Sequence, residues 1–221
     1  RPIGNTTAAS GSGRRRHVDC VIELDGPAAE MLRSRSMPDP CRPYRQMARN
    51  ALLANARLHA ACAALGPGEW EERRVSFFPS LKATLNHILV IDRFYFDAVQ
   101  GGTLGPAAWT DPEPCATVAE LASAQAALDH WTVGFCDDLR PDDLSREVRI
   151  HRTGRVQVET LADTLMHIFL HDQHHRGQAH AMLAGTSVKP PQLDEFFMAD
   201  DDRFRAADLA QAGWDEAALR R

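Results

Sequence analysis

The sequence has no long apolar run, no paired cysteines and no excess of basic residues. No stretch approaches 18 consecutive apolar residues, so we expect neither a transmembrane helix nor a membrane partner. The five cysteines are an odd number and lie far apart without a Cys-x-x-Cys pair. This excludes a disulfide framework and a zinc finger, and it favours reduced thiols in a cytoplasmic protein. The net charge is −5, whereas nucleic-acid binders usually carry a basic surface, so we expect no nucleic-acid partner.

The chain of 221 residues is 44% hydrophobic and 25% charged, which is typical of one soluble globular domain of ordinary size. Residues 1–36 differ from the rest, because a low-complexity segment at 6–13 is followed by three arginines and no apolar stretch of a signal peptide. We therefore predict a disordered N-terminal extension at 1–36, a main domain at 37–200 and a C-terminal appendage at 201–221. A single short helix is expected in the appendage, at about 203–220.

Apolar residues recur at helical spacing in four segments of the main domain, at about 44–65, 80–99, 117–139 and 159–184. Thr117 and Glu120 have the spacing of a capping box at the start of the third segment. Four helices with one apolar face each predict an all-α fold, a four-helix bundle. The long gap from Gly101 to Ala116 allows the second and third helices to run parallel. Alternating valines and isoleucine at 148–158 predict a short hairpin-like arm before the last bundle helix.

The last bundle helix carries a stripe of histidines. His167, His171 and His175 lie one turn apart on one face, and Ile168 beside them indicates that this face points into the bundle. Burying three imidazoles without partners costs a few kcal/mol. A His-x-x-x-His pair can instead supply two ligands to one cation, and His87 on the second helix is a candidate third ligand. The alternative is that these histidines are solvated or hydrogen-bonded within the core.

Two other kinds of metal site, that of a zinc protease and that of a di-iron bundle, are alternatives for this helix. Residues 171–175 read His-Asp-Gln-His-His, so Asp172 would be the general base of a zinc protease. Such enzymes usually take a third ligand downstream and carry a sheet beside the metal helix, and the sequence indicates neither. A di-iron bundle is also disfavoured, because the last helix offers no Glu-x-x-His pair.

Gly177 lies inside the same predicted helix. Glycine at such a position costs about 1 kcal/mol relative to alanine, so a reason for it is expected. Close approach of another backbone at the level of the metal would be one reason, and neutral drift is the alternative.

Two motifs together resemble the DinB family of the DinB/YfiT-like superfamily: Leu-Asn-His-Ile-Leu at 85–89 and His-Asp-Gln-His-His-Arg-Gly-Gln at 171–178. Residues 54–58 and 190–194 support the resemblance, which extends over about 44–197. Leu170 departs from it, since relatives often have asparagine there. The resemblance implies an up-down-down-up bundle and a divalent metal ion, most often zinc or nickel. The metal ligands carried over from the family are His87, His171 and His175, with His167 and His174 placed behind them or in the core.

Three protein ligands leave one coordination position open, which is typical of a catalytic metal site. Superfamily relatives include transferases and isomerases that use low-molecular-weight thiols. The resemblance therefore implies a metal-dependent enzyme, a thiol S-transferase or a hydrolase, whose substrate is a small electrophile; it identifies no further catalytic residue. Two alternatives stay open: a metal-binding stress-response protein without turnover, and an interaction module that acts as a homodimer.

Overall fold

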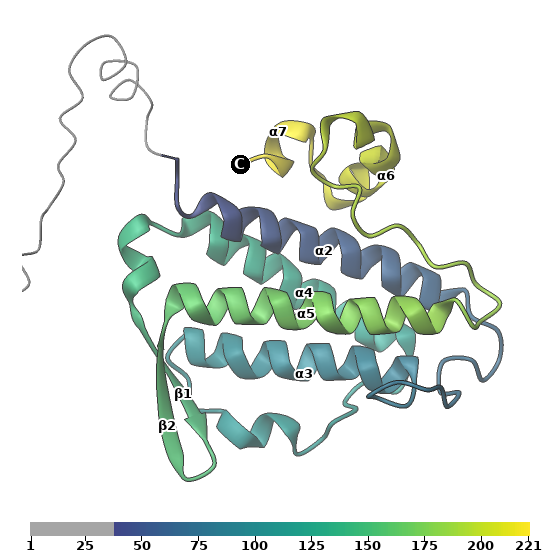
Figure 1. Ribbon diagram of the computed structural model, residues 1–221, viewed down its shortest axis with the longest axis horizontal. Helices are drawn as coiled ribbons and strands as arrows, with labels where there is room; N and C mark the ends of the chain where they lie inside the picture. The colour runs from purple at the N-terminus through teal and green to yellow at the C-terminus, as the bar shows by residue number, and fades with distance from the viewer. Residues whose placement is uncertain (1–37) are drawn as a thin grey trace, which may run out of the picture. The chain divides into compact units, whose positions relative to one another are not determined.

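The computed structural model describes residues 38–221, so the predictions for the N-terminal extension lie outside the described residues. The described part is mostly helical (Figure 1). Its four long helices are α2 (Arg42–Ala63), α3 (Leu81–Val99), α4 (Val118–Asp138) and α5 (Leu161–Leu183). Helix α5 packs against α2 and α3, and α4 packs against the same two helices from the other side of the bundle.

Two apolar clusters establish the direction of each helix. One cluster joins the C-terminal ends of α2 and α5 to the N-terminal ends of α3 and α4. The other joins the opposite ends of the same four helices. Helices α3 and α4 therefore run parallel, and α2 and α5 run in the opposite direction, which is the up-down-down-up order. The connection from α3 to α4 crosses the length of the bundle and contains a short 3₁₀ helix, η1 (Gly105–Trp109).

Side-chain caps define where the helices begin. The Ser80 hydroxyl accepts a hydrogen bond from the Ala83 amide at the start of α3. The predicted capping box at α4 is present, because the Thr117 hydroxyl accepts from the Glu120 amide and the Glu120 carboxylate accepts from the Thr117 amide. These bonds satisfy backbone donors that have no partner within the helix.

The expected arm is a regular β-hairpin, so the fold is mostly helical with a small sheet and not purely α. Strands β1 (Glu147–Arg152) and β2 (Arg155–Thr160) pair antiparallel, and Gly154 takes a φ of 72° in the turn. Val148 and Ile150 are buried, because β1 packs on α3 and η1. The alternating pattern of residues 148–158 predicts the strands, but it does not show that β1 packs on α3 and η1, which are more distant in sequence.

The C-terminal residues differ from the single helix that the sequence predicts. They form η3 (Ala199–Asp201), α6 (Asp202–Ala212) and α7 (Glu216–Leu219), and the helix breaks at Gly213, whose φ of 71° suits glycine. Arg205 is fully buried and forms an ion pair with Glu216 at 2.7 Å. Residues 39–221 form one compact unit that includes this appendage. Within the described residues, no helix is long and apolar enough to span a membrane.

Candidate metal centre

His87 on α3 and His171 and His175 on α5 come together where these two helices pack side by side. One nitrogen of each imidazole lies within 4.8 Å of the other two. The Nε2 atoms of His87 and His171 are 3.1 Å apart. Two nitrogen ligands of a tetrahedral zinc ion, each at 2.0–2.1 Å, lie about 3.3 Å apart. The His87–His171 pair therefore has the spacing of two metal ligands, and the third imidazole lies close enough to complete a group that could hold a metal ion.

The three histidines are neutral at physiological pH. Burial, followed by the charges of His175 and His171, lowers the pKa of His87 to about 4. Burial, followed by the charge of His174, lowers the pKa of His171 to about 4, and burial also lowers the pKa of His175. Metal ligation needs the unprotonated ring, because the lone pair of one nitrogen binds the ion. The imidazoles of the site are thus in the neutral form that metal ligation needs.

Neighbouring side chains orient the ligand rings. His175 Nδ1 donates to Gln178 Oε1 at 2.8 Å, which leaves its Nε2 lone pair free. The Gln178 amide in turn donates to His174 Nε2 at 3.0 Å, so exposed His174 is bonded to Gln178 and lies outside the group of three converging imidazoles. His167 also lies outside the cluster, where its Nε2 bonds the Tyr95 hydroxyl at 3.0 Å. Hydrogen bonds of this kind fix the ring orientation of metal-ligating histidines.

The family model for the DinB family matches residues 37–206. The chain belongs to the DinB family. A search of curated proteins finds no match to it. Membership of the DinB family agrees with the bundle and with three histidines that could hold a metal ion, while the metal and the reaction are not identified by it.

In this DinB-family protein, a layer of buried polar side chains lies inside the bundle behind the histidines. The Gln125 amide donates to Asp92 Oδ2 at 2.8 Å and to Asp129 Oδ1 at 3.0 Å. Asn55 also donates to Asp129, at 3.0 and 3.2 Å. Asp172 belongs to this layer and is 3% exposed. It faces the bundle interior and not an open cleft, so its position does not suit the general base of a zinc protease.

Asp92 and Asp172 share the bundle interior with Asp129 and with the buried cation Arg176, whose charge acts on Asp172 and Asp129. Burial and the neighbouring Asp172 raise the pKa of Asp92 well above its ordinary value, and burial raises the pKa of Asp172 to about 7. Each carboxyl group leaves one oxygen without a hydrogen-bond partner among residues 38–221, as does His171 Nδ1, which is 3.7 Å from Asp172. The pair therefore keeps at least one proton near neutral pH. The sequence did signal this layer, because Asn55 and Gln125 stand at positions of apolar stripes.

A mostly apolar cavity of about 330 Å³ adjoins the centre. Its walls include His87 itself, Ile91, Trp109 of η1 and Phe78, which belongs to the loop before α3. The Phe78 ring packs against the His87 ring at 4.2 Å and against the His175 ring at 5.5 Å between centroids. Sequence reasoning missed Phe78 and Trp109, because Phe78 lies in a loop and Trp109 ends a short 3₁₀ helix, and neither segment has a periodicity that marks its position.

The expected reason for Gly177 is wrong within the described residues. A Cβ atom at this position would meet no atom within 4 Å, and the residue is exposed on α5. No backbone of residues 38–221 therefore approaches it closely.

Proposed function

We propose that this DinB-family protein is a metal-dependent enzyme, in which His87, His171 and His175 hold zinc or nickel and a small thiol occupies the remaining coordination position. One observation carries the proposal: three neutral imidazoles converge within 4.8 Å beside an apolar cavity large enough for a small molecule. A closed structural site would need a fourth protein ligand. Among the described residues, the candidate ligand group contains only these three histidines.

A metal ion in such a site supplies Lewis acidity, which lowers the pKa of a bound thiol or water. Gln178 keeps the Nε2 atom of His175 available, and Phe78 shields the ligand rings from bulk water. The cavity beside His87 takes the apolar part of an electrophile. In the transfer, the thiolate sulfur forms a bond to the electrophilic carbon while the bond to the leaving group breaks. The leaving group keeps the electron pair, and the thiol proton goes to solvent.

The protein's own cysteines are poor candidates for the nucleophile. The four described cysteines are free and buried. Burial raises the pKa of Cys62 and of Cys136 to about 12, so neither forms a thiolate near neutral pH. None of the cysteines in residues 38–221 therefore suits the role, which supports a small-molecule thiol as the source of the sulfur. Reduced, free cysteines also support our proposal of a cytoplasmic location.

Metal analysis followed by cobalt substitution tests the proposal. The purified chain should contain about one divalent ion, and cobalt in its place should give a visible spectrum. Adding a small thiol such as 2-mercaptoethanol should introduce a sulfur-to-cobalt charge-transfer band. A spectral change on adding azide, which replaces an exchangeable metal-bound water, without a change on adding thiol would favour the hydrolase. A spectrum that neither changes would overturn the enzyme proposal in favour of a metal-binding protein without turnover.

We also propose that the protein forms a homodimer. Apolar side chains are exposed on two neighbouring elements, Met166 and Leu170 on α5 and Val156 and Val158 on β2. Exposed apolar groups of this kind gain free energy when a second copy covers them. Sedimentation equilibrium tests this proposal, and a monomer at all concentrations up to 100 micromolar, on the order of a weak dimer's Kd, would overturn it.

A further inference from the structure

Arg152, the last residue of β1, is held firmly but is not neutralised. Its Nη2 donates to the Tyr95 hydroxyl at 2.8 Å, and its Nε donates to Gln157 Oε1 at 3.2 Å. The guanidinium also lies over the Phe94 ring at 4.9 Å and over the Tyr95 ring at 5.4 Å. Within residues 38–221, no carboxylate forms an ion pair with it. Arg152 is thus a positive charge in a fixed position, and its guanidinium has N–H donors beyond the two hydrogen bonds to Tyr95 and Gln157.

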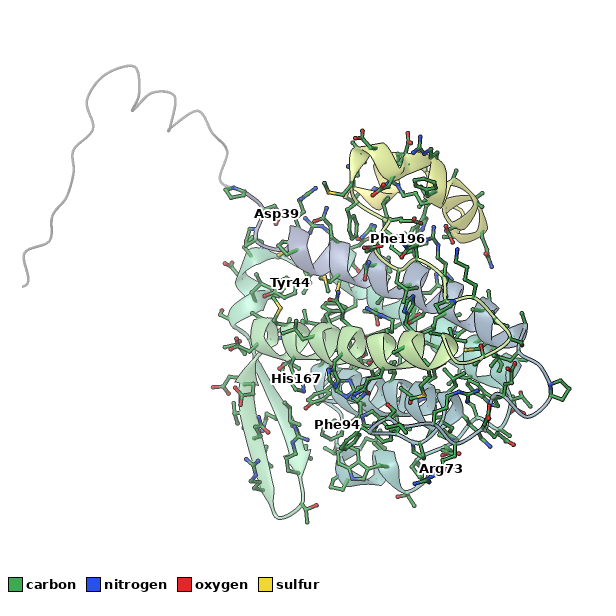
Figure 2. The ribbon with its side chains drawn as sticks, turned by 45° about the vertical axis from the view of Figure 1, so that its right-hand side comes forward. Asp39, Tyr44, Arg73, Phe94, His167 and Phe196 are labelled. Carbon is green, nitrogen blue, oxygen red and sulfur yellow. The ribbon has the colours of Figure 1, made fainter. Side chains whose placement is uncertain are left out.

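Two chains of contacts connect this charge to the metal centre. On the polar side, the Tyr95 hydroxyl that accepts from Arg152 also bonds His167, which stands one turn before His171 on α5. On the apolar side, the Phe94 ring contacts Trp109 at 4.6 Å, and Trp109 lines the same cavity as His87. Figure 2 shows Phe94 and His167 on the two adjacent helices, toward the end of the bundle from which the hairpin extends.

The distance along α3 sets the length of a molecule that would reach both the three-histidine centre and Arg152. Phe94 follows His87 by seven residues on α3, which corresponds to about 10 Å along the helix. Between them lies the apolar wall of the cavity, which includes Val90 and Ile91. A molecule bound at the metal and at Arg152 would therefore need an extended apolar middle that spans about this 10 Å.

The charges around this path favour an anion at the hairpin end. The cross-strand neighbour of Arg152 is Arg155, so two positive charges stand together at this end, while the nearest carboxylate on β2, that of Glu159, accepts from the Gln157 amide at 2.8 Å. The cavity also contains Glu113, and Lys82 lies 3.9 Å from its carboxylate, so a cation accompanies this negative charge. Arginine presents a planar fork of donors that matches a carboxylate.

We propose that Arg152 recognises a carboxylate on the molecule whose other end binds at the three-histidine centre. This inference rests on the proposed function and narrows its substrate class to small carboxylate-bearing thiols or electrophiles with an apolar middle. Arg152 is then a specificity-determining residue. The competing explanation is that Arg152 only packs the hairpin against α3.

Paired probes separate these explanations in the cobalt-substituted full-length protein. The probes are 6-mercaptohexanoate and 6-mercaptohexanol, which share a thiol and a six-carbon chain and differ in the carboxylate. Their Kd values are read from the sulfur-to-cobalt band. The acid should bind at least about tenfold more tightly than the alcohol, because charge-assisted hydrogen bonds are the strong ones.

Variants of the hairpin complete the test. Arg152→Gln should weaken binding of the acid about tenfold and leave the alcohol unchanged, and Arg152→Lys should recover part of the loss. Arg149→Gln is the matched control, because Arg149 is exposed on the opposite face of the same strand. Both probes should bind this control as they bind the wild type.

Three results would count against the inference. Equal Kd values for acid and alcohol in the wild type would overturn it and leave the proposed function standing. An equal loss of affinity for both probes in Arg152→Gln would show that the residue is only structural. If neither thiol changes the cobalt spectrum, the proposed thiol chemistry fails, and this inference fails with it.

Discussion

Replacing His59 with leucine should make the protein less sensitive to acid. His59 stands on α2 and is only 7% exposed. It lines a largely apolar cavity of about 380 Å³ between α2, α4 and α6, whose lining also includes Asp129, His130 and Asp208. Burial alone lowers its pKa from the ordinary 6.5 to about 4. Leucine fills similar space without a group that must lose its hydration, so the variant should fold normally at pH 7.

The magnitude follows from linkage between protonation and folding. Between pH 6.5 and pH 4, His59 is protonated in the unfolded chain and neutral in the folded one. The unfolded state therefore binds more protons, and the free energy of unfolding decreases as the pH falls through this window. With these pKa values, the decrease from pH 7 to pH 5 is about 2 kcal/mol for this one group.

Urea unfolding of the wild type and of His59→Leu at pH 7 and pH 5 measures this contribution. Other buried groups also titrate, and the raised pKa values of Asp92 and Asp172 act in the opposite direction. The difference between the two proteins cancels those groups because they are common to both. The wild type should lose about 2 kcal/mol more than the variant between the two pH values. Equal losses in both proteins would refute the claim that His59 is buried in its neutral form.

Four further predictions concern the metal centre and its partners. His171→Ala and His175→Ala should each abolish stoichiometric metal binding, whereas His174→Ala should keep it; metal analysis of the three variants decides, and loss of metal in His174→Ala alone would make the ligand assignment wrong. Gln178→Leu frees the orientation of the His175 ring and should weaken metal affinity 10–100-fold in a chelator competition, with helix content by circular dichroism unchanged; unaltered affinity would show that the hydrogen bond does not matter. Because the pKa values of His87 and His171 are lowered to about 4, protons should displace the ion only as the pH falls toward 4, and half-loss near pH 6.5 in stepwise dialysis would contradict this. The net charge of −5 predicts no salt-dependent, submicromolar binding to duplex DNA in a fluorescence anisotropy titration, and such binding would add an unexpected nucleic-acid partner.

The bundle was predictable because its signals are local. Apolar spacing and the Thr117–Glu120 cap depend on residues within one or two turns, and the structure has these helices at the expected places. The break at Gly213 was not predicted, since glycine is tolerated inside some helices and is essential at the end of others. The hairpin was expected as an arm from its local alternation, but its packing on α3 depends on contacts with residues distant in sequence.

The candidate site divides in the same way. The structure brings His87 together with His171 and His175, which the sequence had singled out by their shared stripe and by resemblance. Phe78 and Arg152 had no such signal. Phe78 belongs to a loop, and the role proposed for Arg152 depends on its having no ion pair with a carboxylate of residues 38–221, a property of the three-dimensional surroundings that no local pattern encodes.

Because the three histidines come together only in the folded chain, the amount of metal bound at the proposed site would report how much of the protein has its native tertiary structure. His87 precedes His171 by 84 residues, and α4 and the hairpin lie between them in sequence. If the chain were nicked at the turn before Gly154, one fragment would supply one ligand and the other fragment two, so neither would form the full set alone. Since the unfolded chain lacks the set, an ion at 100 times its Kd adds about 2.7 kcal/mol to the apparent stability. Under the proposed metal binding, the melting temperature of this protein should therefore depend on the metal supply of the culture medium as well as on the sequence.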